Sequence, residues 1–279
     1  MNARGAGRPA PEEAGRPRIR LVLTDLDGTL LRDDKTISRR SAETLAAVQA
    51  AGIPVGFSTS RGLRAVEPYS GQIRPDILIA NGGAHVWARG TLLRSCEFSA
   101  AEAQAVFDAA YRTCGGDVEM TADTAGMLFW NRPADGRSQQ YASAAFDDFR
   151  HFSSPVMKIC VQTDDAEKAR QIADCLGGGA VSVLKFSDIP WHAFSKRGAT
   201  KEAALAAVCS HLGISARHVA AFGDDFSDIG MISACGTGVA MANAIPEVKA
   251  CADEITPYTN NEDGVARWIS ERILEQGGR

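Results

Sequence analysis

Short apolar runs alternate with helical patterns at both ends of the chain. The run Ile19–Leu23 predicts a buried strand, and the helical pattern after it begins at Ser38, a capping residue, and ends at Gly52. The segments "IPVGFSTSR" and "DILIANGG" predict two further strands, each preceded by a helical stretch. From Thr200 onwards helices and short strands alternate again. This alternation predicts a parallel sheet with helices on both faces.

The middle of the chain has a different pattern. A capping box formed by Ser99 and Glu102 opens a helix that ends at Gly115, and the strands "DVEMTA" and "GMLFWN" follow. A polar helix is predicted over Arg137–Phe149 and a second helix over Asp165–Leu176, with the strands "PVMKICVQ" and "AVSVLKFS" on either side of the second. This order favours a mostly antiparallel sheet with helices on one face.

We therefore predict an α/β protein in which one unit is inserted into another. Residues 18–83 and 189–279 are expected to form a doubly wound, Rossmann-like parallel sheet, and residues 84–188 an α+β unit. Residues 1–17 are rich in Arg, Gly, Pro and Ala, so we predict a disordered extension there.

Composition and charge exclude several classes of protein. The chain has 279 residues, of which 45% are hydrophobic and 23% charged, as in ordinary globular proteins. A net charge of −4 gives no general reason to bind nucleic acid or an anionic membrane surface. Without a secretory signal or an apolar run of about 20 residues, we expect a cytoplasmic protein. Seven scattered cysteines favour reduced thiols over disulfides or a zinc site.

Polar residues gather where the predicted core strands end or where helices begin. In an open parallel sheet, ligands bind beyond the carboxyl ends of the strands, so we expect these residues to meet there. They form four clusters: Asp25-x-Asp27-x-Thr29, Ser58-Thr59-Ser60-Arg61, Lys201, and Gly223-Asp224-Asp225-Phe226-Ser227-Asp228.

The acidic members of these clusters indicate a cation site. Asp25, Asp27, Asp224 and Asp228 would repel one another unless a divalent cation lay among them. Carboxylates together with water are the ligands that Mg²⁺ prefers. We therefore expect Mg²⁺ as the cofactor.

The remaining members suit an anion. Thr59 offers a hydroxyl group and Lys201 a positive charge, both appropriate for phosphate oxygens. Each cluster alone is also explained by a turn, a helix cap or a solvated side chain, but the four together favour phosphoryl transfer. In that chemistry one carboxylate can be the nucleophile, and a second can protonate the leaving oxygen and later accept a proton from water.

At this point the sequence resembles the haloacid dehalogenase-like (HAD) hydrolase superfamily, and within it the Cof-type phosphatases with a type-two α+β cap. The motifs "LTDLDGTLL", "FSTSR", "RGATKEAAL" and "AFGDDFSDIGMI" carry the resemblance, which extends from Leu21 to the C-terminal helix. The long segment "GVAMANAIPEVKACADEITPYTNNEDGVA" resembles the Cof-type tail, and "ANGG" resembles the point where these proteins leave the core for the cap.

The resemblance implies roles for the acidic residues. Asp25 would be the nucleophile and Asp27 the general acid and base. The metal ligands would be the Asp25 carboxylate, the Asp27 backbone carbonyl and Asp224, with Asp228 in support directly or through water.

The resemblance also implies a phosphate site. Thr59 and Lys201 would hold the phosphoryl group, with backbone N–H groups near Leu26 and Ser60. Two positions depart from the family pattern: Ser60 replaces a glycine, and Ser227 replaces an asparagine. Ser227 can still donate a hydrogen bond to phosphate but reaches less far.

The resulting hypothesis is a phosphatase that acts on small phosphorylated metabolites, such as sugar phosphates. We expect no nucleic-acid or membrane partner. The sequence leaves open whether the protein is a monomer or a dimer. The cap would select the leaving group, although packing or solvation explains each of its candidate side chains more simply: Trp130, Asn131, Arg132, Lys158, Trp191 and His192.

Three alternatives stay in view. A phosphomutase would use the same core and return the phosphoryl group to its substrate. A phospho-signalling module resembling a receiver domain is disfavoured because the third strand ends in "IANGG" without an aspartate. A catalytically idle metabolite sensor is disfavoured because all the chemical groups are in place.

Overall fold

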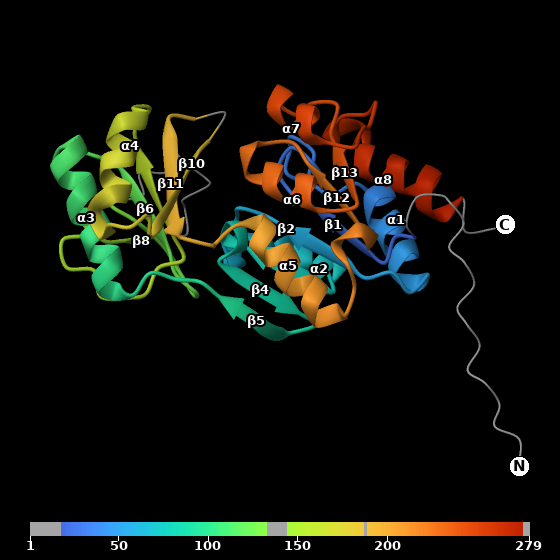
Figure 1. Cartoon of the computed structure of the whole chain (residues 1–279), viewed down its shortest axis with the longest axis horizontal. Helices are drawn as coiled ribbons and strands as arrows, with labels where there is room; N and C mark the ends of the chain where they lie inside the picture. The colour runs from blue at the N-terminus through green and yellow to red at the C-terminus, as the bar shows by residue number, and fades with distance from the viewer. Residues whose placement is uncertain (1–17, 133–143, 187–188, 276–279) are drawn as a thin grey trace, which may run out of the picture.

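Two β-sheets organise the chain. The computed structural model describes residues 18–132, 144–186 and 189–275, and the expected disorder of residues 1–17 lies outside this part. Figure 1 shows the two sheets side by side, each with its own helices. We refer to residues 100–196 as the cap and to the other described residues as the core.

The core sheet is mostly parallel. Among the described residues it has eight strands in the order β14-β13-β12-β1-β2-β3-β4-β5, so that β1 lies in the middle. Pairing is parallel from β14 to β3 and antiparallel from β3 to β5. In chain order the strands are β1 Leu21–Thr24, β2 Val55–Ser58, β3 Ile77–Ala80, β4 His85–Ala88, β5 Thr91–Ser95, β12 Val219–Gly223, β13 Thr237–Ala240 and β14 Glu254–Ile255.

Helices cover both faces of this sheet, as expected for a doubly wound fold. In β1, Val22 packs with α1, α2 and α8 on one face, whereas Leu21 and Leu23 pack with α5 and α6 on the other. The predicted α/β class is therefore confirmed. The core helices are α1 Arg39–Ala50, α2 Leu63–Ile73, α5 Lys201–Leu212, α6 Ile229–Ala234, α7 Pro246–Cys251 and α8 Gly264–Ile269, followed by the π-helical turn η7 Ser270–Leu274.

Shorter 3-10 turns join these elements at the sheet edges. In chain order they are η1 Asn81–Gly83, η4 Ala216–His218, η5 Phe226–Asp228 and η6 Asn260–Glu262. The turn η1 follows β3 directly and η5 follows β12 after two intervening residues, so both lie at the carboxyl edge of the sheet.

The cap is an α+β unit. In the described residues its sheet has six strands, ordered β10-β11-β9-β6-β7-β8, and all pairs are antiparallel except β7 with β8. The helices α3 and α4 pack on one face of this sheet and lie on its side away from the core (Figure 1). The elements are α3 Ala100–Cys114, β6 Met120–Asp123, β7 Leu128–Trp130, β8 Ala145–Phe146, β9 Lys158–Gln162, α4 Ala166–Ala173, η3 Asp174–Leu176, β10 Val181–Lys185 and β11 Trp191–Lys196.

Both cap boundaries lie later in the chain than the 84–188 that we expected. Strands β4 and β5 form a hairpin that continues the core sheet, and β11 pairs with β9 and β10 in the cap sheet. The hairpin turns at Arg89 and Gly90, which both have positive φ, a combination that suits the twist of a two-residue hairpin. Neither these three strands nor the sheet that each of them joins was predicted from the sequence.

The helix expected over Arg137–Phe149 is wrong for its described part. Residues 133–143 lie outside the described residues, and the chain after them forms the short strand β8. Phe149 has a φ of 54°, which a right-handed helix does not allow, and its ring stacks on Phe107 with 4.3 Å between ring centroids. Burial of this ring outweighs the helical pattern of the segment.

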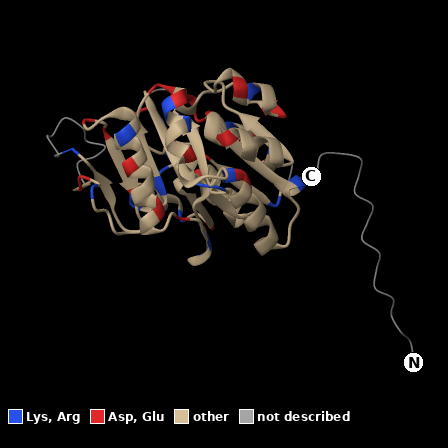
Figure 2. Cartoon of the chain, turned by 60° about the vertical axis from the view of Figure 1, so that its left-hand side comes forward, with Lys and Arg blue, Asp and Glu red and all other residues tan. Residues whose placement is uncertain are grey.

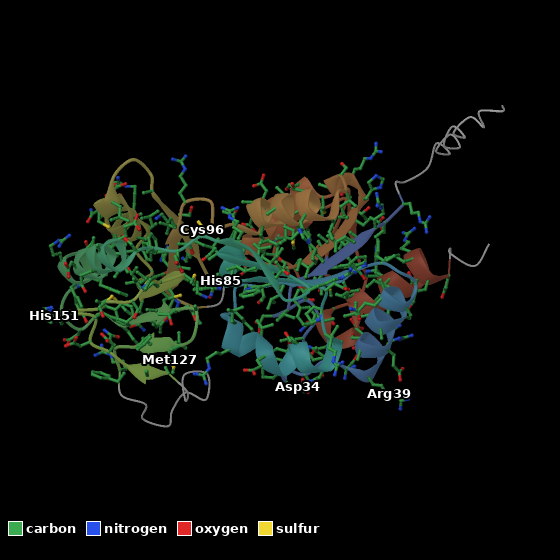
Figure 3. All side chains as sticks on the ribbon, turned by 90° about the horizontal axis from the view of Figure 1, so that it is seen from below. Asp34, Arg39, His85, Cys96, Met127 and His151 are labelled. Atoms are coloured by element: carbon green, nitrogen blue, oxygen red, sulfur yellow. The ribbon has the colours of Figure 1, made fainter. Side chains whose placement is uncertain are left out.

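The two connections between core and cap lie against each other. The Arg94 guanidinium donates a hydrogen bond to the carbonyl of Gly198 (2.8 Å), and the Cys96 thiol donates to the carbonyl of Arg197 (3.7 Å). Figure 3 shows Cys96 at this junction and His151 at the far end of the cap. The chain therefore enters and leaves the cap at the same place.

Residues of both charges occur on the helices of the core and the cap. Figure 2 shows Lys and Arg segments interspersed with Asp and Glu segments on the helices of both core and cap. Within the described part of the chain, none of the helices has the length and apolar character needed to cross a membrane.

Candidate active site

Asp25 and Lys201 meet at the carboxyl edge of the core sheet. Asp25 follows β1, and its N–H donates a hydrogen bond to the carbonyl of Phe222 in the neighbouring β12 (3.0 Å). Lys201 is the first residue of α5, whose N-terminus Thr200 caps through its hydroxyl group. The Lys201 Nζ donates to Asp25 Oδ1 at 2.7 Å and to Asp228 Oδ1 at 2.6 Å. The lysine is 2% exposed, so this ion pair network is buried.

The motif after β12 supplies two further carboxylates. Asp228 Oδ2 accepts the N–H groups of Asp224 (3.0 Å) and Asp225 (3.2 Å), which fixes the turn η5. Asp224 Oδ1 accepts the Thr29 hydroxyl group at 2.8 Å. Gly28 has a φ of +73°, and a Cβ there would lie 2.1 Å from Asp224 Oδ2. Glycine is therefore required for the two motifs to approach each other.

Burial and mutual repulsion shift the protonation of this cluster. Burial raises the pKa of Asp25 well above its usual value against the opposing charge of Lys201, and Asp228 and Asp224 add to the rise. Burial and the charge of Asp228 raise the pKa of Asp224 to about 7. Burial disfavours the Lys201 charge, but Asp228 and Asp25 hold the lysine pKa above its usual value. The cluster holds more negative charge than one lysine neutralises.

The cluster fits a divalent cation. Carboxylate oxygens of Asp25, Asp224 and Asp228 all lie within 4.8 Å of one another. An all-oxygen donor set with surplus negative charge is the type that Mg²⁺ occupies. The structure thus brings together three of the four acidic residues that the sequence assigned to a metal.

The fourth, Asp27, has its carboxylate in a different set of contacts. Arg61 donates two hydrogen bonds to it, Nε to Oδ2 at 2.5 Å and Nη2 to Oδ1 at 2.7 Å, and Lys35 Nζ donates to Oδ1 at 2.8 Å. Burial opposes the charge, but the hydrogen bonds from Arg61 and Lys35 outweigh it and lower the pKa of Asp27 to about 2. In this conformation Asp27 is ionised at neutral pH.

The contacts of Arg61 and Lys35 with Asp27 were not foreseen. Arg61 belongs to the hydroxyl cluster that the sequence singled out, but no role was given to it or to Lys35. The sequence did offer one signal for the Arg61 contact. Arg61 follows β2 and Asp27 follows β1, and these two strands are paired, so the cation and the carboxylate come close together.

Residues 59–62, which we call the Thr59 loop, follow β2. The Thr59 hydroxyl accepts the N–H of Arg61 (3.1 Å), and the side chain is 1% exposed. Gly82 N–H donates to the Thr59 carbonyl (3.0 Å), and Asn81 N–H donates to the Arg61 carbonyl (2.8 Å). The turn after β3 thus holds this loop at the sheet edge.

The other predicted phosphate ligands are less closely defined. Leu26 is fully buried, and its carbonyl accepts the N–H of Leu31 at 2.8 Å. The Ser60 carbonyl accepts a hydrogen bond from Lys158 of the cap, and Ser227 lies half-buried in η5. The structure gives Ser227 a place beside Asp228 but no contact that tests a phosphate-binding role.

Of the cap side chains singled out from the sequence, Lys158 contacts the core. The others form hydrogen bonds or apolar contacts within the cap: Trp130, Asn131, Arg132, Trp191 and His192. These contacts agree with the simpler explanation given from the sequence, in which these side chains stabilise the cap by packing.

Known proteins resemble this chain over nearly its whole length. A sequence model of the haloacid dehalogenase-like hydrolases matches residues 22–269. The 5-amino-6-(5-phospho-D-ribitylamino)uracil phosphatase YitU of Bacillus subtilis is 28% identical over 264 residues, which cover 90% of this chain and 96% of that protein. The HMP-PP phosphatase of Escherichia coli is 30% identical over 241 residues, 83% of this chain and 87% of that protein.

A solved structure agrees with these relatives. A haloacid dehalogenase-like hydrolase from Bacteroides thetaiotaomicron is 26% identical and superposes with a TM-score of 0.77, covering 91% of this chain and 99% of its own. The fold and the matched motifs define a capped α/β hydrolase. The chain belongs to the haloacid dehalogenase-like hydrolase family, and the resemblance stated from its sequence is confirmed.

Proposed function

We propose that this protein is a Mg²⁺-dependent phosphatase that hydrolyses phosphate monoesters of small metabolites through an aspartyl-phosphate on Asp25. The observation that supports the proposal most is the buried contact of Lys201 with Asp25 and Asp228 beside Asp224. A cation and clustered carboxylates at one sheet edge are the components that phosphoryl transfer requires.

In the first step Asp25 attacks phosphorus. Lys201 holds Asp25 Oδ1, which orients the carboxylate so that its other oxygen forms the new P–O bond. The bond from phosphorus to the substrate oxygen breaks, and the leaving alcohol takes a proton from Asp27. Thr59, Lys201 and the backbone near Ser60 hold the phosphoryl oxygens.

In the second step water attacks phosphorus, Asp27 accepts a proton from that water, and the Asp25 carboxylate is released with inorganic phosphate. Asp27 is left ionised by the first step and is therefore available to accept this proton, but the low pKa that Arg61 and Lys35 give it makes it a weak base while they are bound to it. Acting as an acid in the first step requires that Arg61 and Lys35 first turn away from it. The phosphate group of a substrate carries about two negative charges, so Arg61 and Lys35 can bind it in place of Asp27.

Mg²⁺, held by Asp25, Asp224, Asp228 and the backbone carbonyl of Asp27, would neutralise charge on the carboxylates and on the phosphoryl oxygens. Asp228 also fixes the turn that carries Asp224, so it supports the site whether it binds the ion directly or through water.

The class of substrate is supported by the relatives. One relative is named for a phosphorylated ribitylaminouracil and another for HMP-PP, so small phosphorylated metabolites are the class to test first. Sugar phosphates belong in the same panel. We propose that the protein acts in the cytoplasm, where such metabolites occur.

The test is the variant Asp25→Asn, assayed for free phosphate release from an aryl phosphate and a metabolite panel with Mg²⁺. Asparagine keeps the shape and still accepts the Lys201 hydrogen bond, so we expect a loss of at least about 1000-fold in kcat with an intact fold. Asp33→Asn, in the same loop but exposed, is the matched control and should keep full activity. Full activity in Asp25→Asn would exclude the aspartyl-phosphate, and isomer formation without phosphate release would indicate a mutase.

A further inference from the structure

The cap contacts the core through a buried lysine. Lys158 in β9 lies directly opposite Asp123 in β6, and the two side chains form an ion pair with Nζ to Oδ2 at 3.1 Å. The side chains are only 11% and 14% exposed. The same Nζ donates a hydrogen bond to the carbonyl of Ser60 at 2.5 Å, so a cap residue binds the Thr59 loop of the core.

The backbone of the Thr59 loop explains why this bond matters. Three successive carbonyl groups, those of Thr59, Ser60 and Arg61, need hydrogen-bond donors once the loop is covered. The core supplies donors for the first and third, the N–H groups of Gly82 and Asn81. The donor to the middle carbonyl comes from the cap. The loop therefore has its full set of bonds only when the cap is seated.

The approach of cap to loop also depends on a glycine. A Cβ at Gly62 would lie 2.7 Å from Asp123 Oδ1 and 3.4 Å from Asn81 Oδ1. Gly62 has a φ of −71°, which any residue adopts, so space and not backbone conformation requires glycine here. The sequence alone gives no reason for this glycine.

We propose that Lys158, held by Asp123, is a positioning residue that couples seating of the cap to the conformation of the phosphate-binding Thr59 loop. This inference rests on the proposed function, because the loop is the one assigned to phosphate. A charged donor binds a carbonyl more strongly than a neutral one, and the Asp123 carboxylate compensates the lysine charge in the buried contact. Lys158 acts through the Ser60 backbone.

The first test compares Lys158→Met with Lys196→Met. Lys196 lies on the adjacent strand β11 and pairs with Glu102 inside the cap, so it controls for loss of a cap ion pair. We expect the inhibition constant of inorganic phosphate to rise about tenfold or more in Lys158→Met and to stay unchanged in Lys196→Met. Lys158→Arg, which keeps a charged donor, should recover most of the loss.

The second test uses the loop itself. We expect amide hydrogen exchange at Arg61, Asn81 and Gly82 to accelerate in Lys158→Met, because their bonds belong to the same loop arrangement. Gly62→Ala should give the same two effects by keeping Asp123 away. Its control is Gly71→Ala in α2, where a Cβ meets nothing within 4 Å.

The outcomes separate this inference from the proposed function. If the wild-type protein hydrolyses phosphate esters while Lys158→Met and Gly62→Ala match it in phosphate inhibition and loop exchange, the coupling is wrong and the phosphatase assignment stands. If the wild-type protein hydrolyses none, the proposed function fails, and the exchange comparison still decides whether Lys158 orders the loop. A thermal unfolding scan of each variant shows whether the fold is retained.

Discussion

At the scale of single residues, the site depends on one lysine that balances two of three clustered carboxylates. Lys201 contacts Asp25 and Asp228, whereas Asp224 is held by the neutral hydroxyl group of Thr29. Asp224 is therefore the carboxylate whose charge is left for an added cation, in agreement with its pKa of about 7. Binding of Mg²⁺ should stabilise the folded state through this residue.

The corresponding prediction concerns Asp224→Asn. The amide oxygen still accepts the Thr29 hydroxyl group, but the charge is lost. Mg²⁺ at about 100-fold over its Kd should stabilise the wild-type protein by about 2.7 kcal/mol, and this gain should disappear in the variant. Thermal unfolding with and without Mg²⁺ measures it, with the exposed Asp164→Asn of the cap as control. An equal gain in Asp224→Asn would contradict the assigned metal site.

The candidate residues could be foreseen because their motifs follow predicted strands, but their contacts could not. The sequence brings Asp25, Asp224 and Lys201 to one edge as soon as the sheet is assumed parallel. The engagement of Asp27 by Arg61 depends on rotamers and on the course of a loop, which the sequence pattern does not determine.

At the scale of elements, Asp76 joins three parts of the core. It precedes β3, and its carboxylate accepts hydrogen bonds from Gln49 of α1 (3.0 Å), the N–H of Val55 in β2 (3.1 Å) and Arg89 of the β4–β5 turn (3.1 Å). Partial burial opposes its charge, but these hydrogen bonds outweigh that effect and lower the pKa of Asp76. The β4–β5 hairpin is thus tied to the sheet by an acidic residue.

Asp76→Asn should therefore destabilise the protein in a pH-dependent manner. The folded-state pKa lies below the unfolded value of about 3.9, so the stabilisation is present above that pH and is lost as the pH falls through the folded pKa. We expect the variant to be about 1 kcal/mol less stable at pH 7 and the difference to shrink at about pH 3. Urea unfolding at both pH values measures this, and an equal difference at both would contradict it.

Secondary structure was easier to foresee than membership of a sheet. The predicted helix starts at Ser38, Ser99, Asp165 and Thr200 are confirmed, and so is the capping role predicted for Ser38 and Ser99, because capping is local in the sequence. The strands β4, β5 and β11 were not predicted, and the expected boundaries placed their residues in the other unit, because strand pairing is decided by partners far away in the chain.

At the scale of the whole molecule, the turn η1 between the core strands β3 and β4 depends on a close approach at Gly83. Its φ is +106°, and a Cβ there would lie 2.2 Å from the carbonyl oxygen of Thr200, the cap of α5. This turn is thus packed directly against the start of the helix that carries Lys201. A change at Gly83 affects both the turn and the position of Lys201.

Gly83→Ala should lower both stability and activity. We expect a loss of about 2 kcal/mol or more, from backbone strain together with displacement of α5. Gly82→Ala is the matched control, because Gly82 has a φ of +65° but nothing within 4 Å of its Cβ position, so only the strain of about 1 kcal/mol applies. Denaturant unfolding and kcat measure the two effects. Equal losses in both variants would contradict the close approach.

The central position of β1 also determines the order in which the protein can form during synthesis. This strand is synthesised before the other described strands, yet its neighbour β12 comprises residues 219–223, which are made about two hundred residues later. The cap sheet draws its strands from residues 120–196 and can close while the core still lacks β12, β13 and β14, three of the eight strands described for its sheet. A chain interrupted before residue 219 therefore carries the strands of the cap and leaves the backbone N–H and C=O groups along one edge of β1 unpaired.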